Sequence, residues 1–339
     1  MAKRKYFEIA EGEKGDEEIR ELNNLSDLLE DTGRYISGEI SNERKFYSWE
    51  INDGLSWAGL IEPGGFILIS GKEKSKKSTF AGMFASAFLC QNYINRNHED
   101  TRIASFREFQ KIRCNIRWDA PFLYFDTEQG KNDFTRSQNA IMMNAGYYNG
   151  LPLDKKGNPT INYYAYRLIL IPDPVKKVQF IFKKIIELGE KFGFIGCVAL
   201  DVITDFVENQ LDDQQAKEFY NELFYLREKY LFDIIGVIHQ NRANNQTNGS
   251  IGVVSNKRCN YLIQLQKHEI APGQDYEDGP TTAITEFKRT EEYFKKVMFD
   301  FVPNEHGIML PSFVEETQGL NAYGVVSGMS NQFPTKYKY

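Results

Sequence analysis

The stretch Phe66-Ile-Leu-Ile-Ser-Gly71-Lys-Glu-Lys-Ser-Lys-Lys77-Ser78-Thr79 decides the fold of this chain. It reads as an apolar strand over 66–70, a loop crowded with lysines and hydroxyls, and then the start of a helix. In such a layout the backbone N–H groups of the loop and of the helix N-terminus point at phosphates, a lysine neutralises them, and a Ser or Thr hydroxyl meets Mg²⁺. The stretch therefore predicts a nucleotide-phosphate cradle, with a lysine-rich surface loop as the plainer alternative.

The spacing within this stretch follows the phosphate-binding pattern Gly, four residues, then Gly-Lys-Ser/Thr, except at one position. Gly71 and the Lys77-Ser78 pair are the correct distance apart, but Lys76 replaces the second glycine. That glycine normally lets the backbone turn tightly against the phosphate. The residues expected to hold ATP are Gly71, Lys72, Glu73, Lys74, Ser75, Lys76, Lys77, Ser78 and Thr79.

Size and composition allow one large α/β domain with small additions, or two modest domains, in 339 residues. A net charge of −6 gives no global basic field, so nucleic-acid binding would have to use local patches. The four cysteines form no Cys-x-x-Cys pair, and Cys197 lies in an apolar run that is typical of a core. No apolar run approaches a membrane span. We therefore expect a soluble, cytoplasmic protein with reduced thiols, no zinc site and no membrane partner.

Apolar strands alternate with helical segments over the middle of the chain, which predicts a parallel sheet covered by helices on both faces. The expected strands are 66–70, 121–125, 166–171, 195–200 and 233–238, and the expected helices are 79–95, 132–145, 174–192 and 213–230. In such sheets ligands lie beyond the carboxyl ends of the strands. Four strands end there in polar residues, namely the lysine loop, Asp126 with Glu128, Asp201, and His239-Gln240-Asn241.

The remaining segments surround this core. Period-two strands at 260–266, 282–287 and 296–301 predict an antiparallel extension of the sheet on its C-terminal side. The polar, basic residues 96–119 resemble an inserted surface segment, and the Asn- and Gly-rich residues 242–254 resemble a mobile loop that binds a partner or a DNA strand, or an ordinary surface loop. The predicted division is a charged arm at 1–47, an ATPase domain at 48–311 and a tail at 312–339. An apolar stripe at 17–30 in the arm suits a helix that packs on its own domain or on a neighbouring subunit.

Two acids at this edge have chemical roles to fill. Asp201 would hold Mg²⁺, usually through its water, beside the Ser78 hydroxyl, unless it only caps a turn. Hydrolysis also needs a group that orients and polarises the attacking water. Glu128 is the favoured candidate, while Asp126 competes for this role and an ordinary loop acid is the remaining reading.

Polar and basic residues further along could sense or stabilise the γ-phosphate. Gln240, or His239 beside it, could hydrogen-bond the phosphate and pass its presence to the following loop. Lys288 and Arg289 follow a strand and could reach a γ-phosphate held by an adjacent subunit, or could form a solvated basic pair. Lys257-Arg258 is a weaker candidate for contacts with nucleic-acid phosphates.

Together these motifs resemble the RecA-like ATPase core, and most of all the RepA-like hexameric helicases of plasmids and other mobile elements. The resemblance covers roughly residues 48–303 and follows the order Gly71–Ser78, Glu128, Asp201, His239-Gln240, Gly249-Ser250 and Lys288-Arg289. It implies a RecA-type fold, with ATP and Mg²⁺ at a subunit interface. Lys77 and Ser78 would bind phosphate and Mg²⁺, Glu128 would be the catalytic carboxylate, Asp201 the metal-associated acid and Gln240 or His239 the sensor. Lys288 and Arg289 would act across the interface, and Arg136 would pack on the base.

The same resemblance implies a ring or filament of identical subunits on single-stranded DNA, with a replication or recombination protein as a further partner. Three functions remain open at this point. The chain is an ATP-hydrolysing DNA motor, a RecA-like regulator or loader that grips a protein partner without unwinding DNA, or a nucleotide-binding structural component with negligible turnover. Lys76 in the place of glycine affects the expectation of a normal turnover rate more than the expectation of nucleotide binding.

Overall fold

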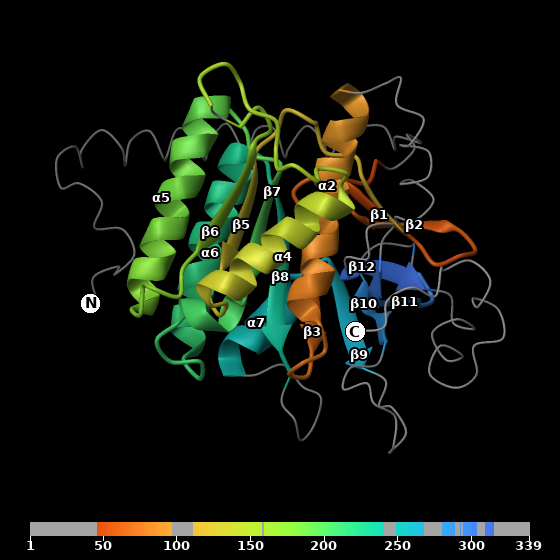
Figure 1. The fold of residues 1–339 in the computed structure, drawn as a ribbon. Helices are drawn as coiled ribbons and strands as arrows, with labels where there is room; N and C mark the ends of the chain where they lie inside the picture. Colours follow the sequence, from red (N-terminus) through yellow and green to blue (C-terminus); the bar gives the residue numbers. More distant parts are fainter. Residues whose placement is uncertain are drawn as a thin grey trace, which may run out of the picture. The chain divides into compact units, whose positions relative to one another are not determined.

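The computed structural model describes most of the chain from Phe46 to Val314 (Figure 1). The described residues are 46–96, 111–157, 159–240, 249–267, 280–288, 292, 294–303 and 309–314. The predicted arm helix at 17–30, Arg289, the first part of the loop predicted at 242–254 and the tail beyond 314 lie outside them.

Nine of the described strands form one sheet in the order β12-β11-β10-β9-β3-β8-β7-β5-β6. The strands from β9 to β6 run parallel, and β10, β11 and β12 continue the sheet in antiparallel fashion. The predicted fold class, a mainly parallel sheet with an antiparallel extension on the C-terminal side, is therefore confirmed. The parallel strands are β3 (Phe66–Gly71), β5 (Phe122–Asp126), β6 (Tyr163–Arg167), β7 (Cys197–Asp201), β8 (Asp233–His239) and β9 (Tyr261–Lys267). The extension consists of β10 (Thr281–Lys288), β11 (Val297–Pro303) and β12 (Met309–Val314).

Helices pack on both faces of this sheet because its inner strands carry apolar side chains on both faces. On one face lie α2 (Lys77–Arg96) and α4 (Lys131–Asn144), which contact each other and cross over the strands (Figure 1). On the other face lie α5 (Pro174–Phe192), α6 (Asp213–Tyr230) and α7 (Gly249–Arg258). The side chain of Phe66 in β3 points to this second face, where its ring centroid lies 5.9 Å from that of Tyr220 in α6.

Strand alternation decides which end residues share the α2 face. Phe122 of β5 packs on Phe88 of α2, with ring centroids 5.2 Å apart. Since successive side chains alternate between faces, Tyr124 and Asp126 lie on the same side of β5 as Phe122. The phosphate loop leads into α2 on that side, so the sheet directs these polar side chains toward it.

A second, three-stranded antiparallel sheet was not predicted. It consists of β1 (Trp49–Asn52), β2 (Trp57–Ile61) and β4 (Ile112–Cys114) in the order β2-β1-β4. The expectation of a surface insertion at 96–119 is therefore wrong for the residues of β4. Ile112 and Cys114 are buried while Arg113 between them is exposed, a two-residue alternation that the surrounding arginines obscured in the sequence.

Three further boundaries differ from the prediction. The strand expected at 166–171 is β6 at 163–167, and the apolar residues that suggested the later position include the exposed Leu170. Residues 249–254, which were predicted as part of a loop, belong to α7, where Ile251 and Val254 are buried. β12 continues through Val314, three residues into the expected tail, because it pairs with β11. In each case a tertiary contact overrode a weak local signal.

The four cysteines Cys90, Cys114, Cys197 and Cys259 are buried free thiols. Cys197 lies in the core of β7, as its apolar neighbours predicted. Within the described part of the chain, every helix is too short or too polar to cross a membrane.

A buried carboxylate joins the small sheet to the large one at the end of β8 that is remote from the phosphate loop. Asp233 accepts hydrogen bonds from Trp49 Nε1 at 3.1 Å and from the backbone N–H of Gly64 at 2.7 Å. Burial raises the pKa of Asp233 to about 7, although its hydrogen bonds favour the ionised form. The folded protein therefore binds a proton here more tightly than the unfolded chain does.

We expect this carboxyl to make the fold less stable as the pH rises from 3.8, its ordinary pKa, to about 7. The protonated carboxyl contributes its full stabilisation below pH 3.8, and this contribution is lost above about pH 7. Since each unit of pKa difference corresponds to about 1.4 kcal/mol, the loss is up to about 4 kcal/mol. Urea unfolding at pH 4 to 8 checks this, with Asp233→Asn as the comparison. A slope that is identical in the wild type and the variant would contradict it.

Candidate functional site

The phosphate loop connects β3 to α2, in the strand–loop–helix order that the sequence predicted. The loop closes on itself through a hydrogen bond from Ser75 N to Lys72 O at 3.3 Å. The helix then begins at Lys77, and Phe80 N donates to Lys76 O at 3.0 Å. The side chains of Lys72, Glu73 and Lys74 are exposed, Ser75 is buried, and Ser78 and Thr79 are half-buried. The backbone N–H groups of a helix N-terminus are thus presented at the end of a parallel strand.

Gly71 is required by packing at the start of the loop. A Cβ atom at this position would lie 2.4 Å from Ser75 Oγ and 3.1 Å from Leu265 O. Any larger residue would push the loop away from β9. The first glycine of the pattern therefore has a steric reason that is independent of its sequence spacing.

Lys76 adopts the left-handed backbone conformation that its position demands. Its φ is 59°, and Lys74 two residues earlier has a φ of 60°. Residues that alternate into this conformation turn successive N–H groups toward one concave side, which forms an anion-binding nest. Lys76 therefore takes the backbone shape expected of the missing glycine, at the steric cost that a side chain has there.

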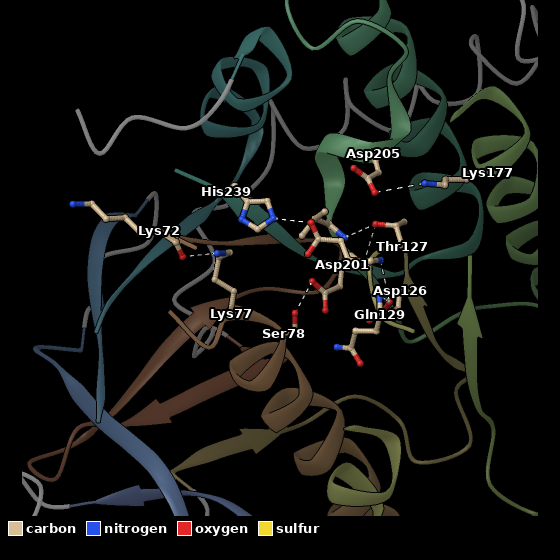
Figure 2. A network of polar contacts seen from close by, with 12 residues as sticks. Lys72, Lys77, Ser78, Asp126, Thr127, Gln129, Lys177, Asp201, Asp205 and His239 are labelled. Carbon is tan, nitrogen blue, oxygen red and sulfur yellow. Dashed lines mark hydrogen bonds and ion pairs between the residues drawn. The ribbon is translucent and has the colours of Figure 1, made fainter. Parts of the chain in front are cut away.

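Lys77 points its charged end into the loop (Figure 2). The residue is only 5% exposed, and its Nζ donates to Lys72 O at 2.7 Å. Burial lowers the pKa of Lys77 to about 8, while the nearby Glu128, Asp201 and Glu73 act in the opposite direction. A buried ammonium group whose described partner is a loop carbonyl is well suited to bind a phosphate oxygen.

Ser78 and Asp201 meet although 123 residues separate them in the chain. Ser78 Oγ donates to Asp201 Oδ1 at 3.1 Å. Figure 2 marks this hydrogen bond with a dashed line. The other oxygen, Oδ2, accepts from the hydroxyl of Tyr124 at 2.9 Å. Burial raises the pKa of Asp201 to about 6, against these two hydrogen bonds. The predicted pair of metal-associated groups is thus in direct contact.

Asp126 lies beside Asp201 but turns toward the backbone. The two residues are register partners in the parallel pair β5–β7. Asp126 Oδ1 accepts from the N–H groups of Glu128 at 3.2 Å and Gln129 at 2.7 Å, so it caps the turn after β5. Burial, with the neighbouring Asp201, raises the pKa of Asp126 to about 7. This arrangement makes Asp126 the weaker of the two candidates for the water-orienting acid.

Glu128 extends from that turn toward β8 and contacts His239. Glu128 Oε1 and His239 Nε2 are 2.9 Å apart. This hydrogen bond holds the pKa of Glu128 below its ordinary value despite partial burial, with Lys77 and Lys177 acting in the same direction. The Glu128 side chain is 48% exposed, so an ionised carboxylate faces the space beside the phosphate loop.

Of the two sensor candidates, His239 is the one bonded to Glu128. Gln240 is 4% exposed, its Nε2 donates to Ser70 Oγ at 3.3 Å, and its backbone N donates to Gly71 O at 2.9 Å. His239 and Gly71 are also register partners between β8 and β3. A displacement of His239 or Gln240 would therefore move Gly71, at the start of the phosphate loop.

Of the other predicted site residues, Arg136 is not in this cluster. Arg136 lies on α4 with its side chain 81% exposed, and its described ion pair is with Asp133 on the same helix at 3.8 Å. Lys288 is the last residue of β10. The structure does not describe its side chain or any part of Arg289. Lys257 and Arg258 are in the last turn of α7, where Arg258 donates to Asn221 Oδ1 at 2.8 Å. Their predicted contacts with nucleotide, a second subunit or DNA stay predictions.

The sequence interpretation missed the side chains of Tyr124, Thr127 and Lys177. Tyr124 holds Asp201, and the backbone N of Val202 donates to Thr127 Oγ1 at 3.1 Å, which joins the ends of β5 and β7. Lys177 of α5 lies 3.5 Å from Asp205 with its side chain 10% exposed. Strand alternation would have placed Tyr124 on the same face as Asp126, whereas nothing local marks Lys177.

Tyr124→Phe tests whether the hydroxyl positions Asp201. We expect a loss of about 1–2 kcal/mol in the free energy of unfolding, because a buried carboxylate oxygen loses its donor. We also expect Mg²⁺-dependent binding of ADP to weaken about tenfold, as for other residues that orient a metal ligand. Calorimetric titration with and without Mg²⁺ measures this second effect.

Tyr163→Phe is the matched control. Tyr163 is also buried, and its hydroxyl donates at 2.7 Å to Gln138 Oε1 on α4, outside the cluster of acids. Its removal should reduce stability and leave the Mg²⁺ dependence unchanged. Equal effects of both variants on Mg²⁺-dependent binding would show that Tyr124 has only a structural role.

The residues present fit a magnesium nucleotide. Mg²⁺ in nucleotide sites is held by one or two protein oxygens and by substrate phosphates. Ser78 Oγ and the buried Asp201 carboxylate supply such oxygens, and the buried Lys77 cation and the loop N–H groups supply donors for phosphate. The donor set is thus all oxygen on the metal side and all N–H on the phosphate side.

The comparisons with known proteins return structural likeness alone. No protein-family model matches the chain, and no curated protein matches it. Among solved structures, a KaiC-like protein, PH0186, from the hyperthermophilic archaeon Pyrococcus horikoshii OT3 has a TM-score of 0.44 and 14% sequence identity, covering 75% of this chain and 92% of its own. The RadB recombinase has a TM-score of 0.42 and 14% identity, covering 71% of this chain and 88% of its own. At these scores the likenesses carry no inference about function.

Proposed function

We propose that this chain is an ATP-hydrolysing enzyme of the RecA-like P-loop type. The observation that carries the proposal is the direct contact of Ser78 Oγ with Asp201 at 3.1 Å, next to the buried Lys77. Parallel strands bring these groups to one edge of the sheet, where ligands of such sheets bind. An ordinary lysine-rich surface loop would not require a buried lysine and a buried carboxylate at the same place.

Each residue has a defined part in this proposal. The loop N–H groups and Lys77 bind the phosphates, and Ser78 and Asp201 hold the magnesium ion, which neutralises the phosphate charge when it is bound. Glu128 orients a water molecule whose oxygen attacks the γ-phosphorus while the bond to the β–γ bridging oxygen breaks. The products are ADP and phosphate, and the proton of the water passes to Glu128 and then to solvent. His239 reports on the state of Glu128 through their hydrogen bond.

We further propose that hydrolysis drives an oligomeric motor on single-stranded DNA, of the RepA-like helicase type found in mobile elements. This finer proposal is supported by the sequence resemblance and by the open edge of the site, where half of the Glu128 side chain is exposed. In a ring or filament, Lys288 and Arg289 of one subunit would complete the site of its neighbour. A regulator or loader that uses ATP to grip a protein partner is the second candidate, because it would use the same residues.

One set of assays separates these functions. The rate of ATP hydrolysis is measured with and without single-stranded DNA, and the mass in solution is measured with and without a non-hydrolysable ATP analogue and oligonucleotide. Stimulation by DNA together with assembly supports the motor. ATP-dependent binding of a protein partner that survives Glu128→Gln supports the regulator. A protein that takes up no adenine nucleotide in calorimetry contradicts both.

A further inference from the structure

Lys76 has a strained backbone conformation that the proposed function does not explain. The residue occupies the left-handed region with a φ of 59°. Side chains other than those of Gly, Asn and Asp are uncommon there, because Cβ approaches the neighbouring carbonyl oxygen. A lysine in this conformation has a steric cost, which favours a change to the right-handed region unless another contact offsets it. Such a change would rotate the peptide units of the nest and turn their N–H groups away from a bound phosphate.

The side chain of Lys76 is held on the antiparallel extension of the sheet. Its Nζ lies 2.6 Å from Asp300 Oδ1 on β11, and the two side chains are only 7% and 13% exposed. The same Nζ lies 5.3 Å from the centre of the Phe301 ring. Asp300 Oδ1 also accepts from the backbone N of Phe301 at 2.8 Å, which fixes the direction of the carboxylate. A charge pair with so little exposure is screened far less than a surface pair.

A second contact connects the same two elements. The Phe80 ring in the first turn of α2 lies 5.2 Å from the Phe299 ring of β11. The start of α2 and the phosphate loop therefore rest on one strand at two points, on either side of Lys77. The position of β11 therefore affects the backbone conformation of the phosphate loop.

We propose that Lys76 and Asp300 are positioning residues, and that their buried ion pair keeps the phosphate loop in its anion-binding shape in place of the glycine of the usual pattern. The inference rests on the proposed function and adds a part of the chain, β11, to the machinery of the site. Asp300 touches neither phosphate nor metal in this scheme. It acts only through the conformation of Lys76.

The design of the test follows from the properties of glycine, which adopts the left-handed region without a tether. Asp300→Asn is made in the wild type and in the Lys76→Gly background. In the wild type we expect the affinity for Mg²⁺-ADP to fall roughly tenfold, because the loop loses the ion pair that offsets the cost of the left-handed conformation at Lys76. In the Lys76→Gly background the same change should alter affinity by less than about twofold. The affinity of Lys76→Gly itself is the reference value for that background.

Lys74 offers a matched control within the same loop. Its φ is 60°, as unusual as that of Lys76, but its side chain is exposed. Lys74→Gly therefore introduces a glycine at a left-handed position without removing the ion pair with Asp300. In the Lys74→Gly background, Asp300→Asn should still weaken binding roughly tenfold.

Hydrogen exchange of the amides at 72–77, measured without nucleotide, provides a readout that is independent of the proposed function. Asp300→Asn should accelerate this exchange about tenfold in the wild type and hardly at all in the Lys76→Gly background. If the wild type takes up no nucleotide, the proposed function fails while the exchange data still decide the tether. If Asp300→Asn has the same effect in both backgrounds, or none in the wild type, the ion pair merely stabilises β11 and the inference is overturned.

Discussion

Glu128→Gln should slow hydrolysis by orders of magnitude while the protein continues to bind ATP. The glutamine keeps the size of the side chain and an oxygen for His239, but it cannot accept a proton from water. Because positioned general bases contribute about 10²–10⁴-fold to rates, the turnover rate should fall by that factor. The dissociation constant for ATP should change by less than about threefold, since Glu128 is not among the groups that bind the phosphates.

The acid beside it provides the control for this experiment. Asp126 is buried at 1% exposure and is engaged by two backbone N–H groups, and asparagine can accept the same hydrogen bonds. Asp126→Asn should therefore retain most of the hydrolysis rate. Rapid turnover in Glu128→Gln combined with none in Asp126→Asn would reverse the two roles and would move the water-orienting acid to the end of β5.

Lys77→Met should strongly weaken nucleotide binding without unfolding the protein. Methionine replaces most of the apolar stem of this buried side chain but carries no charge for the phosphates. A charge-assisted hydrogen bond contributes roughly 1.5–3 kcal/mol, so the affinity for ATP should fall by about 10–100-fold or more. The thermal midpoint should stay the same or rise, because a buried ammonium group is replaced by an apolar one. Lys77→Ala should lose binding in the same way, with an additional loss of packing.

The low pKa of Lys77 provides a second measurement on the wild type. Burial places this pKa at about 8, and a bound triphosphate favours the charged form. Affinity should be highest below that pH and should fall as the pH rises through it, by at most tenfold for each unit. Lys77→Met should not show this fall. Lys72→Met changes an exposed lysine of the same loop and should leave both the affinity and its pH dependence close to those of the wild type.

Sequence patterns determined the parts of the architecture that depend on local periodicity. Strands such as β3 and β7 are short, continuous runs of buried residues, and α6 has an apolar stripe at helical spacing, so their positions follow from neighbouring residues. The strand–loop–helix order around Lys77 also follows from adjacent residues. Because parallel strands present their carboxyl ends at one edge, the meeting of Ser78 with Asp201 was predictable without any contact being known.

The tertiary structure alone decided the partners of these residues. Lys76 and Asp300 are separated by 224 positions, and Trp49 and Asp233 by 184, so no local pattern connects them. The hydrogen bond from Tyr124 to Asp201 and the contact of Glu128 with His239 likewise depend on strand register and side-chain direction. Local backbone geometry specifies which residues reach the edge of the sheet. The pairing of buried charges there depends on which groups the packed sheet removes from water together, and only the complete fold determines that.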